Sequence, residues 1–246
     1  MCRHLAYLGP PVTLASLVLD PPHSLYRQSW APADMRGGGS VNADGFGLGW
    51  YSDDSVVRYR RSVPIWADES LPELAASITS GAVLAAVRNG TVGAPLTETA
   101  VAPFTKNQWL FSHNGLISNW PSSVSKLAEA LPTTELLTLD APMDSALIWA
   151  LVQHRLHLGA PEAVASVVRD IAAAAPDSRL NLLLTDGEQL VATTWTHSLW
   201  TRRTTDAIAV SSEPWTTTGW EQVPDHSLLI ATKDTLAVTS LMEGRL

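Results

Sequence analysis

Basic residues are scarce in this sequence and nowhere form a run. Lysine and arginine number 16 against 24 acidic residues, which gives a formal net charge of −8. Binding to nucleic acid needs clustered lysine and arginine side chains, so we expect no nucleic-acid partner. No apolar stretch reaches the ~18 residues of a membrane-spanning helix, and no signal-peptide pattern follows the start. We therefore expect no membrane partner and a cytoplasmic location.

Cysteine is rarer still, because the only one is Cys2, directly after the initiator methionine. This excludes a disulfide within the chain, and an unpaired thiol fits a reducing compartment. Removal of Met1 would leave a cysteine with a thiol and a free α-amine on one carbon. Their ordinary pKa values are about 8.5 and about 7.7–8.0, so near neutral pH the amine can take the thiol's proton. The alternative is that a small residue after the initiator methionine has no role.

Short β-type runs lie toward both ends of the sequence, and helical patterns lie between them. The expected strands are 5–8, 46–51, 56–60, 83–87, 109–112, 182–185, 190–196, 208–210, 228–231 and 236–239. The expected helices are 71–80, 122–131, 144–158 and 162–174. This order favours sheets covered by helices over alternating βαβ units, and so the α+β class. No repeat or linker divides the chain, so we expect one domain over residues 1–246.

Three short segments with polar residues or glycines lie within expected strands or at their ends. Glycines alternate within residues 42–51, which indicates close approach of a ligand or of another chain segment. Arg88, among glycines at a strand end, is suited to grip a carboxylate with two hydrogen bonds, although a surface turn would look the same. Asn114 and Gly115 offer two adjacent N–H donors for an oxyanion, although Asn-Gly is also a turn signal.

Taken together, these residues resemble the class II glutamine amidotransferase family, whose catalytic residue is an N-terminal cysteine. The resemblance rests on the order of Cys2, the Asp-Gly-x-Gly-x-Gly strand, Arg88 with Thr91, Asn114-Gly115 and Asp144. It covers the first ~145 residues and is specific through the combination, since each piece alone is weak. The family's fold is a four-layer αββα sandwich of the N-terminal nucleophile hydrolase type, which the expected strands and helices allow.

The resemblance implies the catalytic residues. Cys2 would be the nucleophile and its α-amine the general base, while Asn114 and Gly115 would form the oxyanion hole. It implies no cofactor. A metal site is a weak rival: His154 and His157 are three residues apart on an expected helix, but no zinc-type carboxylate–histidine spacing accompanies them. We expect no metal.

The resemblance also implies how the substrate's glutamyl head would bind. Arg88 would bind the α-carboxylate with Thr91 beside it, and Asp144 would pair with the α-ammonium. A zwitterionic head needs one cation and one anion, which agrees with these residue types. The sequence departs from some synthases at Val92, where they carry histidine after the threonine.

The stretch 25–30, followed by 42–51, is similar to a stand-alone branch of the family. This branch cleaves γ-glutamyl-hercynylcysteine sulfoxide to glutamate and hercynylcysteine sulfoxide in ergothioneine biosynthesis, through a γ-glutamyl thioester. The chain ends at Leu246, which we expect to leave no room for a synthase domain. Two alternatives stay open: a glutaminase subunit that supplies ammonia to a separate synthase, and a non-catalytic γ-glutamyl-binding subunit that keeps Met1.

The sequence holds 10 tryptophans against 3 phenylalanines. Aromatic faces attract quaternary ammonium groups, such as the trimethylammonium of hercynine, by about 0.5–2 kcal/mol each. Some of the tryptophans could therefore wall the leaving-group pocket, although ordinary packing is the alternative for each one: Trp30, Trp109, Trp120, Trp195, Trp215 and Trp220. Residues 25–39 are a candidate lid, and residues 211–213 fit a plain strand-end turn better than a pocket wall.

Overall fold

Two antiparallel sheets form the centre of the protein. The computed structural model describes residues 2–36, 41–53, 55–91 and 93–242, so Met1, the glycines at 37–39 and Val92 lie outside the described residues. The first sheet has the order β11-β9-β10-β1-β4-β2-β3, and the second β13-β12-β8-β7-β6-β5. The strands are β1 (Arg3–Thr13), β2 (Phe46–Ser52), β3 (Ser55–Arg61), β4 (Thr79–Val87), β5 (Phe104–Lys106), β6 (Trp109–Leu116), β7 (Arg179–Thr185), β8 (Gln189–Thr194), β9 (Trp200–Arg203), β10 (Ile208–Ser211), β11 (Glu221–Gln222), β12 (Ser227–Thr232) and β13 (Leu236–Ser240).

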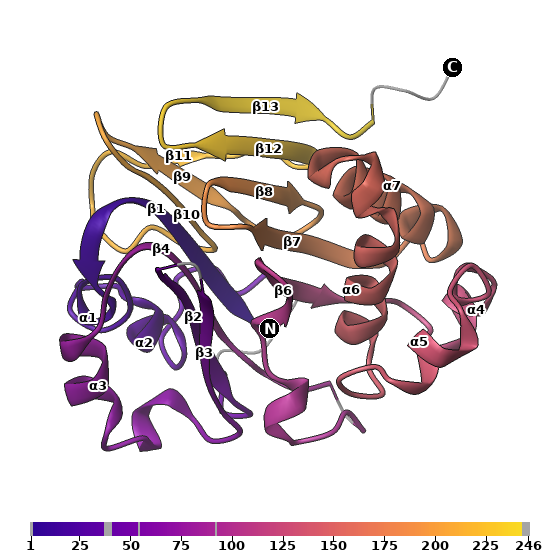
Figure 1. Ribbon diagram of the computed structural model, residues 1–246, viewed down its shortest axis with the longest axis horizontal. Helices are drawn as coiled ribbons and strands as arrows, with labels where there is room; N and C mark the ends of the chain where they lie inside the picture. The colour runs from indigo at the N-terminus through magenta and orange to yellow at the C-terminus, as the bar shows by residue number, and fades with distance from the viewer. Residues whose placement is uncertain (1, 37–40, 54, 92, 243–246) are drawn as a thin grey trace.

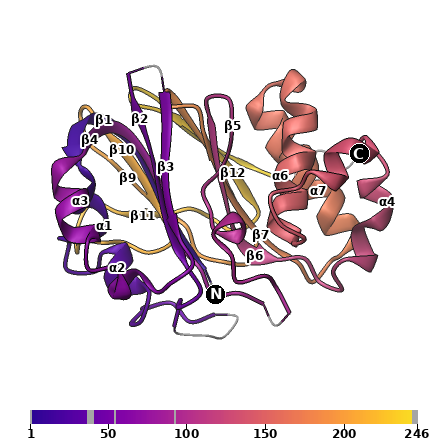
Figure 2. The same ribbon diagram turned by 60° about the horizontal axis from the view of Figure 1, so that its bottom comes forward.

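Helices cover the outer face of each sheet. They are α1 (Leu14–Val18), α2 (Leu25–Gln28), α3 (Leu71–Ser77), α4 (Ser125–Ala128), α5 (Thr133–Leu137), α6 (Asp144–Arg155) and α7 (Ala160–Ala174), with 3₁₀ turns at Ile65–Ala67, Glu98–Ala100, Ser122–Val124 and Leu156–Leu158. Figures 1 and 2 show α1, α2 and α3 on one side of the stacked sheets and α6 and α7 on the other. The α+β prediction of a four-layer αββα sandwich is therefore confirmed.

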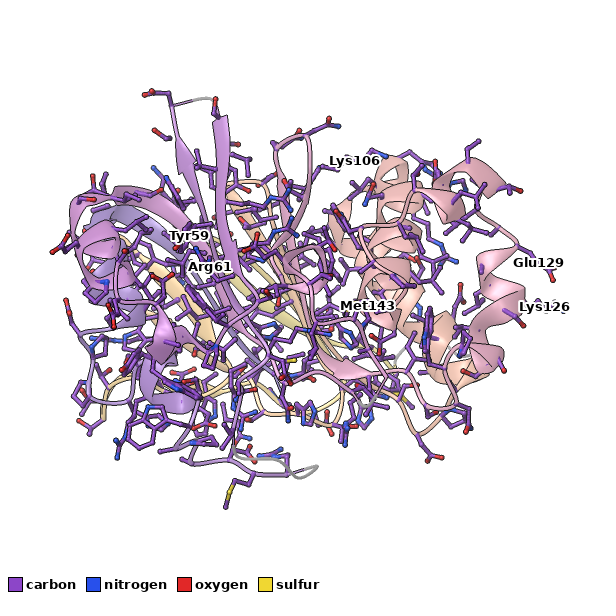
Figure 3. The ribbon with its side chains drawn as sticks, turned by 90° about the horizontal axis from the view of Figure 1, so that it is seen from below. Tyr59, Arg61, Lys106, Lys126, Glu129 and Met143 are labelled. Carbon is purple, nitrogen blue, oxygen red and sulfur yellow. The ribbon has the colours of Figure 1, made fainter. Side chains whose placement is uncertain are left out.

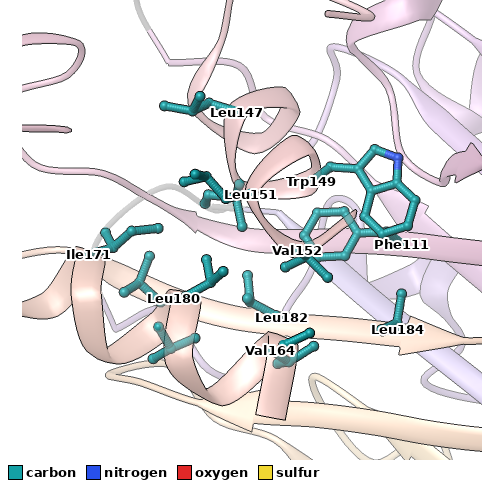
Figure 4. Packing of buried hydrophobic residues seen from close by; sticks show 14 of the residues in the cluster. Phe111, Leu147, Trp149, Leu151, Val152, Val164, Ile171, Leu180, Leu182 and Leu184 are labelled. Atoms are coloured by element: carbon teal, nitrogen blue, oxygen red, sulfur yellow. The ribbon is translucent and has the colours of Figure 1, made fainter. Parts of the chain in front are cut away.

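Three apolar layers hold the sandwich together. Along β1, Leu5 and Tyr7 pack against the α1–α3 side, whereas Ala6 and Leu8 face the second sheet. This alternation follows from the two-residue period of a strand. The largest layer joins the second sheet to α6 and α7, where Phe111 and Trp149 stack with ring centroids 5.1 Å apart (Figure 4). Within the described part of the chain, no helix is both long and apolar enough to cross a membrane.

The alternating glycines of β2 lie against neighbouring segments of the chain. A Cβ added to Gly47 would collide with the backbone carbonyl of Ala102, and one added to Gly49 would come within 2.8 Å of Leu110. The sequence predicted close approach of either a ligand or another chain segment, and the second of these is confirmed. A side chain at either position would force these neighbouring segments to shift.

Most of the expected elements are present, with differences at their ends. The helix expected over 71–80 ends at Ser77, because residues 79–87 join the first sheet as β4. The expected helix 122–131 is a 3₁₀ turn followed by the short α4. Three strands are absent from the sequence prediction: β5, β9 and β11. They are two to four residues long, so no alternating pattern can develop in them.

Candidate active site

Cys2 stands immediately before β1, a central strand of the first sheet. β1 pairs with β10 on one side and β4 on the other, so the start of β1 is fixed from both sides. The Cys2 thiol lies 3.7 Å from the carbonyl oxygen of Asn89, in the loop that follows β4. In Figure 2 the N-terminal end lies at the foot of the stacked sheets. The strand order therefore brings the thiol to the loop that carries Arg88.

Arg88 follows β4 directly and is almost fully buried. Its backbone N–H donates to the Gly45 carbonyl at 2.7 Å, and its Nη1 donates to the Asp44 carbonyl at 3.4 Å. Among the described residues no partner accepts from its Nη2. A buried guanidinium with an unused donor is suited to a carboxylate ligand, because arginine bonds carboxylates through two parallel N–H groups.

Asp44 shapes the loop around Arg88, a role that the sequence interpretation missed. Its carboxylate accepts from the Gly90 N–H at 2.8 Å, and its own N–H donates to the Arg88 carbonyl at 3.0 Å. A side chain at position 90 would crowd the guanidinium, since a Cβ there would come within 3.3 Å of the Arg88 Nη2. The Asp-Gly pair at the start of the β2 motif was the available signal, because aspartate commonly caps loop N–H groups.

Asn114 and Gly115 lie near the end of β6, beside β7. The Asn114 side chain is buried, and its Nδ2 donates to Ser212 Oγ at 3.5 Å, the upper limit of a hydrogen bond. No described residue donates to its Oδ1. A Cβ on Gly115 would collide with the backbone carbonyl of Arg179, so only glycine fits there.

Asp144 is the first residue of α6, as the sequence predicted. Its Oδ2 accepts from the Ile117 N–H at 3.0 Å, and its Oδ1 from the Ser145 N–H at 2.7 Å. A carboxylate at a helix start is favoured by the helix dipole and by free backbone N–H groups. These bonds fix the orientation of the carboxylate and leave further lone pairs for a cationic ligand.

One cleft brings these residues together. Five of the six predicted site residues line it, and they are Cys2, Arg88, Thr91, Gly115 and Asp144. Asn114 is next to this lining and not part of it. The cleft encloses about 730 Å³, part of it open to solvent, which matches the size of small-molecule sites. It contains a thiol, a guanidinium and a carboxylate.

Trp120 and Met143 contribute apolar wall to the cleft. Met143, labelled in Figure 3, lies just before α6. The other tryptophans proposed for the pocket have different surroundings: Trp215 and Trp220 pack edge to face, Trp195 packs on His226, Trp109 packs against the large core, and Trp30 lies under the Arg27 guanidinium. Ordinary packing therefore accounts for most of the six.

A buried layer of histidines lies next to the site. Burial, reinforced by the charge of Arg3, lowers the pKa of His4 to about 3. Burial also lowers the pKa of His113, so this imidazole is neutral. Its Nε2 lies 2.9 Å from the Arg179 carbonyl and its Nδ1 2.9 Å from Ser145 Oγ. Since a carbonyl only accepts, the proton belongs on Nε2, and Nδ1 accepts from the serine.

The residues at 211–213 are more than a strand-end turn. Ser211 ends β10, and Ser212 and Glu213 are both almost fully buried. Ser212 Oγ accepts from the backbone N–H of His4 at 3.0 Å, and Ser212 N–H donates to the His4 carbonyl at 2.9 Å. The chain does bend after β10, as expected, and residues 211–213 do not line the cleft; in addition, the buried side chains of Ser212 and Glu213 bond to the start of β1.

The metal alternative gains no support from the helix that carries its two histidines. His157 Nδ1 hydrogen-bonds to the carbonyl of His154 at 3.0 Å. No group of three or more histidine, cysteine, aspartate or glutamate side chains suited to a metal occurs among the residues that the structure describes.

The chain belongs to the class II glutamine amidotransferases, because that family's model matches residues 16–211. Across nearly its whole length it is similar to two curated proteins, each a γ-glutamyl-hercynylcysteine sulfoxide hydrolase. The protein of Mycolicibacterium smegmatis is 38% identical over 98% of this chain and 100% of its own length. That of Mycobacterium tuberculosis is 37% identical over 98% of this chain and 97% of its own length.

Solved structures share the fold at lower sequence identity. A glutamine aminotransferase class-II domain protein from Silicibacter pomeroyi superposes with a TM-score of 0.70 at 22% identity, covering 98% of this chain and 99% of its own. Glutamine phosphoribosylpyrophosphate amidotransferase from B. subtilis gives a TM-score of 0.71 at 13% identity, covering 99% of this chain and 50% of its own. The four-layer sandwich is therefore the fold of glutamine amidotransferases.

Proposed function

We propose that this protein is an amidohydrolase that cleaves the γ-glutamyl amide of γ-glutamyl-hercynylcysteine sulfoxide. Its products are glutamate and hercynylcysteine sulfoxide, and residues 1–246 work as one domain in the cytoplasm on this small molecule. The observation that carries the proposal is one cleft that holds the Cys2 thiol, the buried Arg88 guanidinium and the Asp144 carboxylate. The full-length similarity to two hydrolases of this substrate supports the choice of leaving group.

The glutamyl head binds through its two charges. Arg88 receives the α-carboxylate with the donor that no described residue uses, and Thr91 lies beside it. Asp144 receives the α-ammonium, with its carboxylate already oriented by the Ile117 and Ser145 N–H groups. A group that carries both charges is thereby aligned, and alignment of this kind lowers the barrier of the reaction that follows.

Acylation of Cys2 is the first chemical step. After removal of Met1, the α-amine takes the thiol proton, and the thiolate attacks the γ-carbonyl carbon. The oxyanion that forms accepts from the Gly115 N–H and from the Asn114 amide, whose bond to Ser212 is long and easily exchanged. The intermediate collapses, the C–N bond breaks, and the ammonium passes its proton to the departing amine. Hercynylcysteine sulfoxide leaves, and a γ-glutamyl thioester stays on Cys2.

Hydrolysis returns the enzyme to its starting state. Water loses a proton to the α-amine and attacks the thioester carbonyl, with the same two donors on the oxyanion. The carbon–sulfur bond breaks, glutamate forms, and the thiolate regains a proton from the ammonium. The reaction consumes one water and needs no cofactor.

Glutamate release by the purified protein tests the proposal. γ-Glutamyl-hercynylcysteine sulfoxide and glutamine are offered side by side, with Cys2→Ala as the control. We expect fast release from the sulfoxide and little from glutamine, all of it dependent on Cys2. Release from glutamine alone would indicate a glutaminase subunit, and release from neither, with Met1 removed, would overturn the proposed activity.

A further inference from the structure

Glu213 is buried, with a relative exposure of 2%, and it lies among donors that flank the nucleophile. Its carboxylate accepts from Arg3 Nε at 2.8 Å, His23 Nε2 at 2.6 Å, Ala33 N–H at 2.7 Å and Asp34 N–H at 3.3 Å. Burying a carboxylate is costly unless it is fully hydrogen-bonded. One donor comes from the residue after Cys2, and the others come from the segment 23–34.

Arg3 connects this carboxylate to Cys2 itself. While its Nε bonds Glu213, its Nη1 donates to the Cys2 carbonyl at 3.0 Å and its Nη2 donates to the Asp34 carbonyl. The guanidinium is planar, so fixing one edge on Glu213 fixes the direction of the others. The peptide plane that follows Cys2 is therefore held from the side. That plane fixes the position of the Cys2 Cα, from which the α-amine and the thiol extend, and so limits where both groups can lie.

We propose that Glu213 is a positioning residue, which holds Cys2 in its reactive orientation through the Arg3 guanidinium. The inference rests on the proposed role of Cys2 as nucleophile. Glu213 also holds residues 23–34 next to Arg3, and here its backbone contributes as well: Gln28 Nε2 donates to the backbone carbonyl oxygen of Glu213 at 3.4 Å.

The electrostatics of the group agree with this role. Burial alone would raise the pKa of Glu213, but hydrogen bonds from His23 and Ala33 and the charge of Arg3 outweigh burial and lower that pKa. The carboxylate is therefore ionised at neutral pH, as an acceptor of several N–H groups must be. Within the described part of the chain, the hydrogen bonds of this carboxylate go to Arg3, His23, Ala33 and Asp34, and not to Arg88 or Asp144. Loss of Glu213 should thus disturb the nucleophile and leave the binding of the glutamyl head intact.

Two variants separate positioning from general stability. Glu213→Gln keeps the shape of the side chain and one acceptor oxygen, but its amide N–H group faces N–H donors that the carboxylate accepts from. Arg3→Lys keeps the charge and one bond but cannot also reach the Cys2 and Asp34 carbonyls. The matched control is Thr194→Val in β8. It is nearly isosteric and removes buried hydrogen bonds to Pro224 and Ser227, far along the chain from Cys2.

The readouts are kcat, the inhibition constant of glutamate and the rate at which iodoacetamide alkylates Cys2, the only thiol in the chain. We expect both site variants to lower kcat about tenfold or more, with the glutamate constant unchanged to within about twofold. The double variant should resemble the singles, because residues of one network act as a unit. Thr194→Val should change only thermal stability.

The alkylation rate keeps the two proposals separable. We expect it to change about threefold or more in the Glu213 and Arg3 variants relative to Thr194→Val, even if the unaltered protein hydrolyses neither substrate. In that case the proposed activity falls and the positioning role stands. The positioning role would be overturned if Glu213→Gln folded and had the same alkylation rate and kcat as the control. If Glu213→Gln did not fold, the same result in Arg3→Lys would overturn it.

Discussion

The backbone of Arg179 lies against the bare Cα of Gly115. A side chain at position 115 would collide with the Arg179 carbonyl oxygen, and His113 Nε2 would be only 2.7 Å away. The same carbonyl oxygen accepts the His113 hydrogen bond at 2.9 Å. The contact keeps β6 and β7 in close register beside the cleft, with the Gly115 N–H at the proposed oxyanion site.

Gly115→Ala should therefore impair both stability and turnover. Relief of the collision requires a backbone shift, and overpacking of this kind typically costs about 1–3 kcal/mol. We expect a thermal midpoint lower by several degrees, since about 1 kcal/mol corresponds to about 2–4 °C at this chain length. Differential scanning calorimetry and kcat check the prediction. An unchanged midpoint would mean that the strands adjust freely at this point.

Asn114→Ala should reduce kcat by about 10²–10³, the usual effect of losing one oxyanion donor. The substrate's head would still bind through Arg88 and Asp144, so KM should change little. Steady-state kinetics on the γ-glutamyl substrate measures both constants. A fall in kcat of less than about threefold would leave Gly115 as the sole donor of the oxyanion site.

Arg88→Lys should mainly weaken substrate capture. An ammonium cannot reproduce the two parallel N–H bonds, and one charged hydrogen bond contributes about 1.5–3 kcal/mol. We expect KM to rise about ten- to a hundredfold, with a smaller effect on kcat. Arg60→Lys is the matched control, because Arg60 also donates to a backbone carbonyl, that of Val101, at 3.2 Å but lies outside the cleft lining. An unchanged KM in Arg88→Lys would remove Arg88 from its proposed role.

His4 should make the protein less stable in mild acid. Burial lowers its pKa from 6.5 to about 3, so between these values the unfolded chain binds a proton that the folded chain does not. Stability is therefore lost as the pH falls below about 6.5, at roughly 1 kcal/mol per pH unit for one such group. Urea unfolding at several pH values measures the slope. His4→Gln should make the slope shallower by the share of one group, because burial also lowers the pKa values of His113 and His197, whereas His157→Gln, which removes an exposed imidazole, should change it less.

The sequence predicted the parts of the site that belong to local patterns. Local patterns placed Cys2, Arg88 and Gly115 at strand ends and Asp144 at a helix start, whereas the roles proposed for them came from the resemblance to the family. The αββα fold followed from the order of strands and helices together with the family resemblance. The glycines of β2 correctly predicted close approach to another chain segment, because such an approach requires residues without a side chain.

Glu213 could not be found in this way. Its bond to Arg3 joins residues 210 positions apart, and no local pattern reports such a pairing. The surrounding Ser-Ser-Glu favours an exposed turn by composition, whereas the folded chain buries it. The helix expected at 122–131 fails for a related reason: tertiary packing decides the conformation of a short amphipathic stretch.

Intact-mass analysis of the protein, alone and rapidly quenched during turnover, tests the N-terminal thioester mechanism. We expect a chain that has lost Met1 and a transient adduct of one glutamyl residue on the peptide that begins with Cys2. Cys2→Ala should show no adduct. A protein that keeps Met1, or that releases glutamate with no adduct on Cys2, would contradict the N-terminal thioester mechanism.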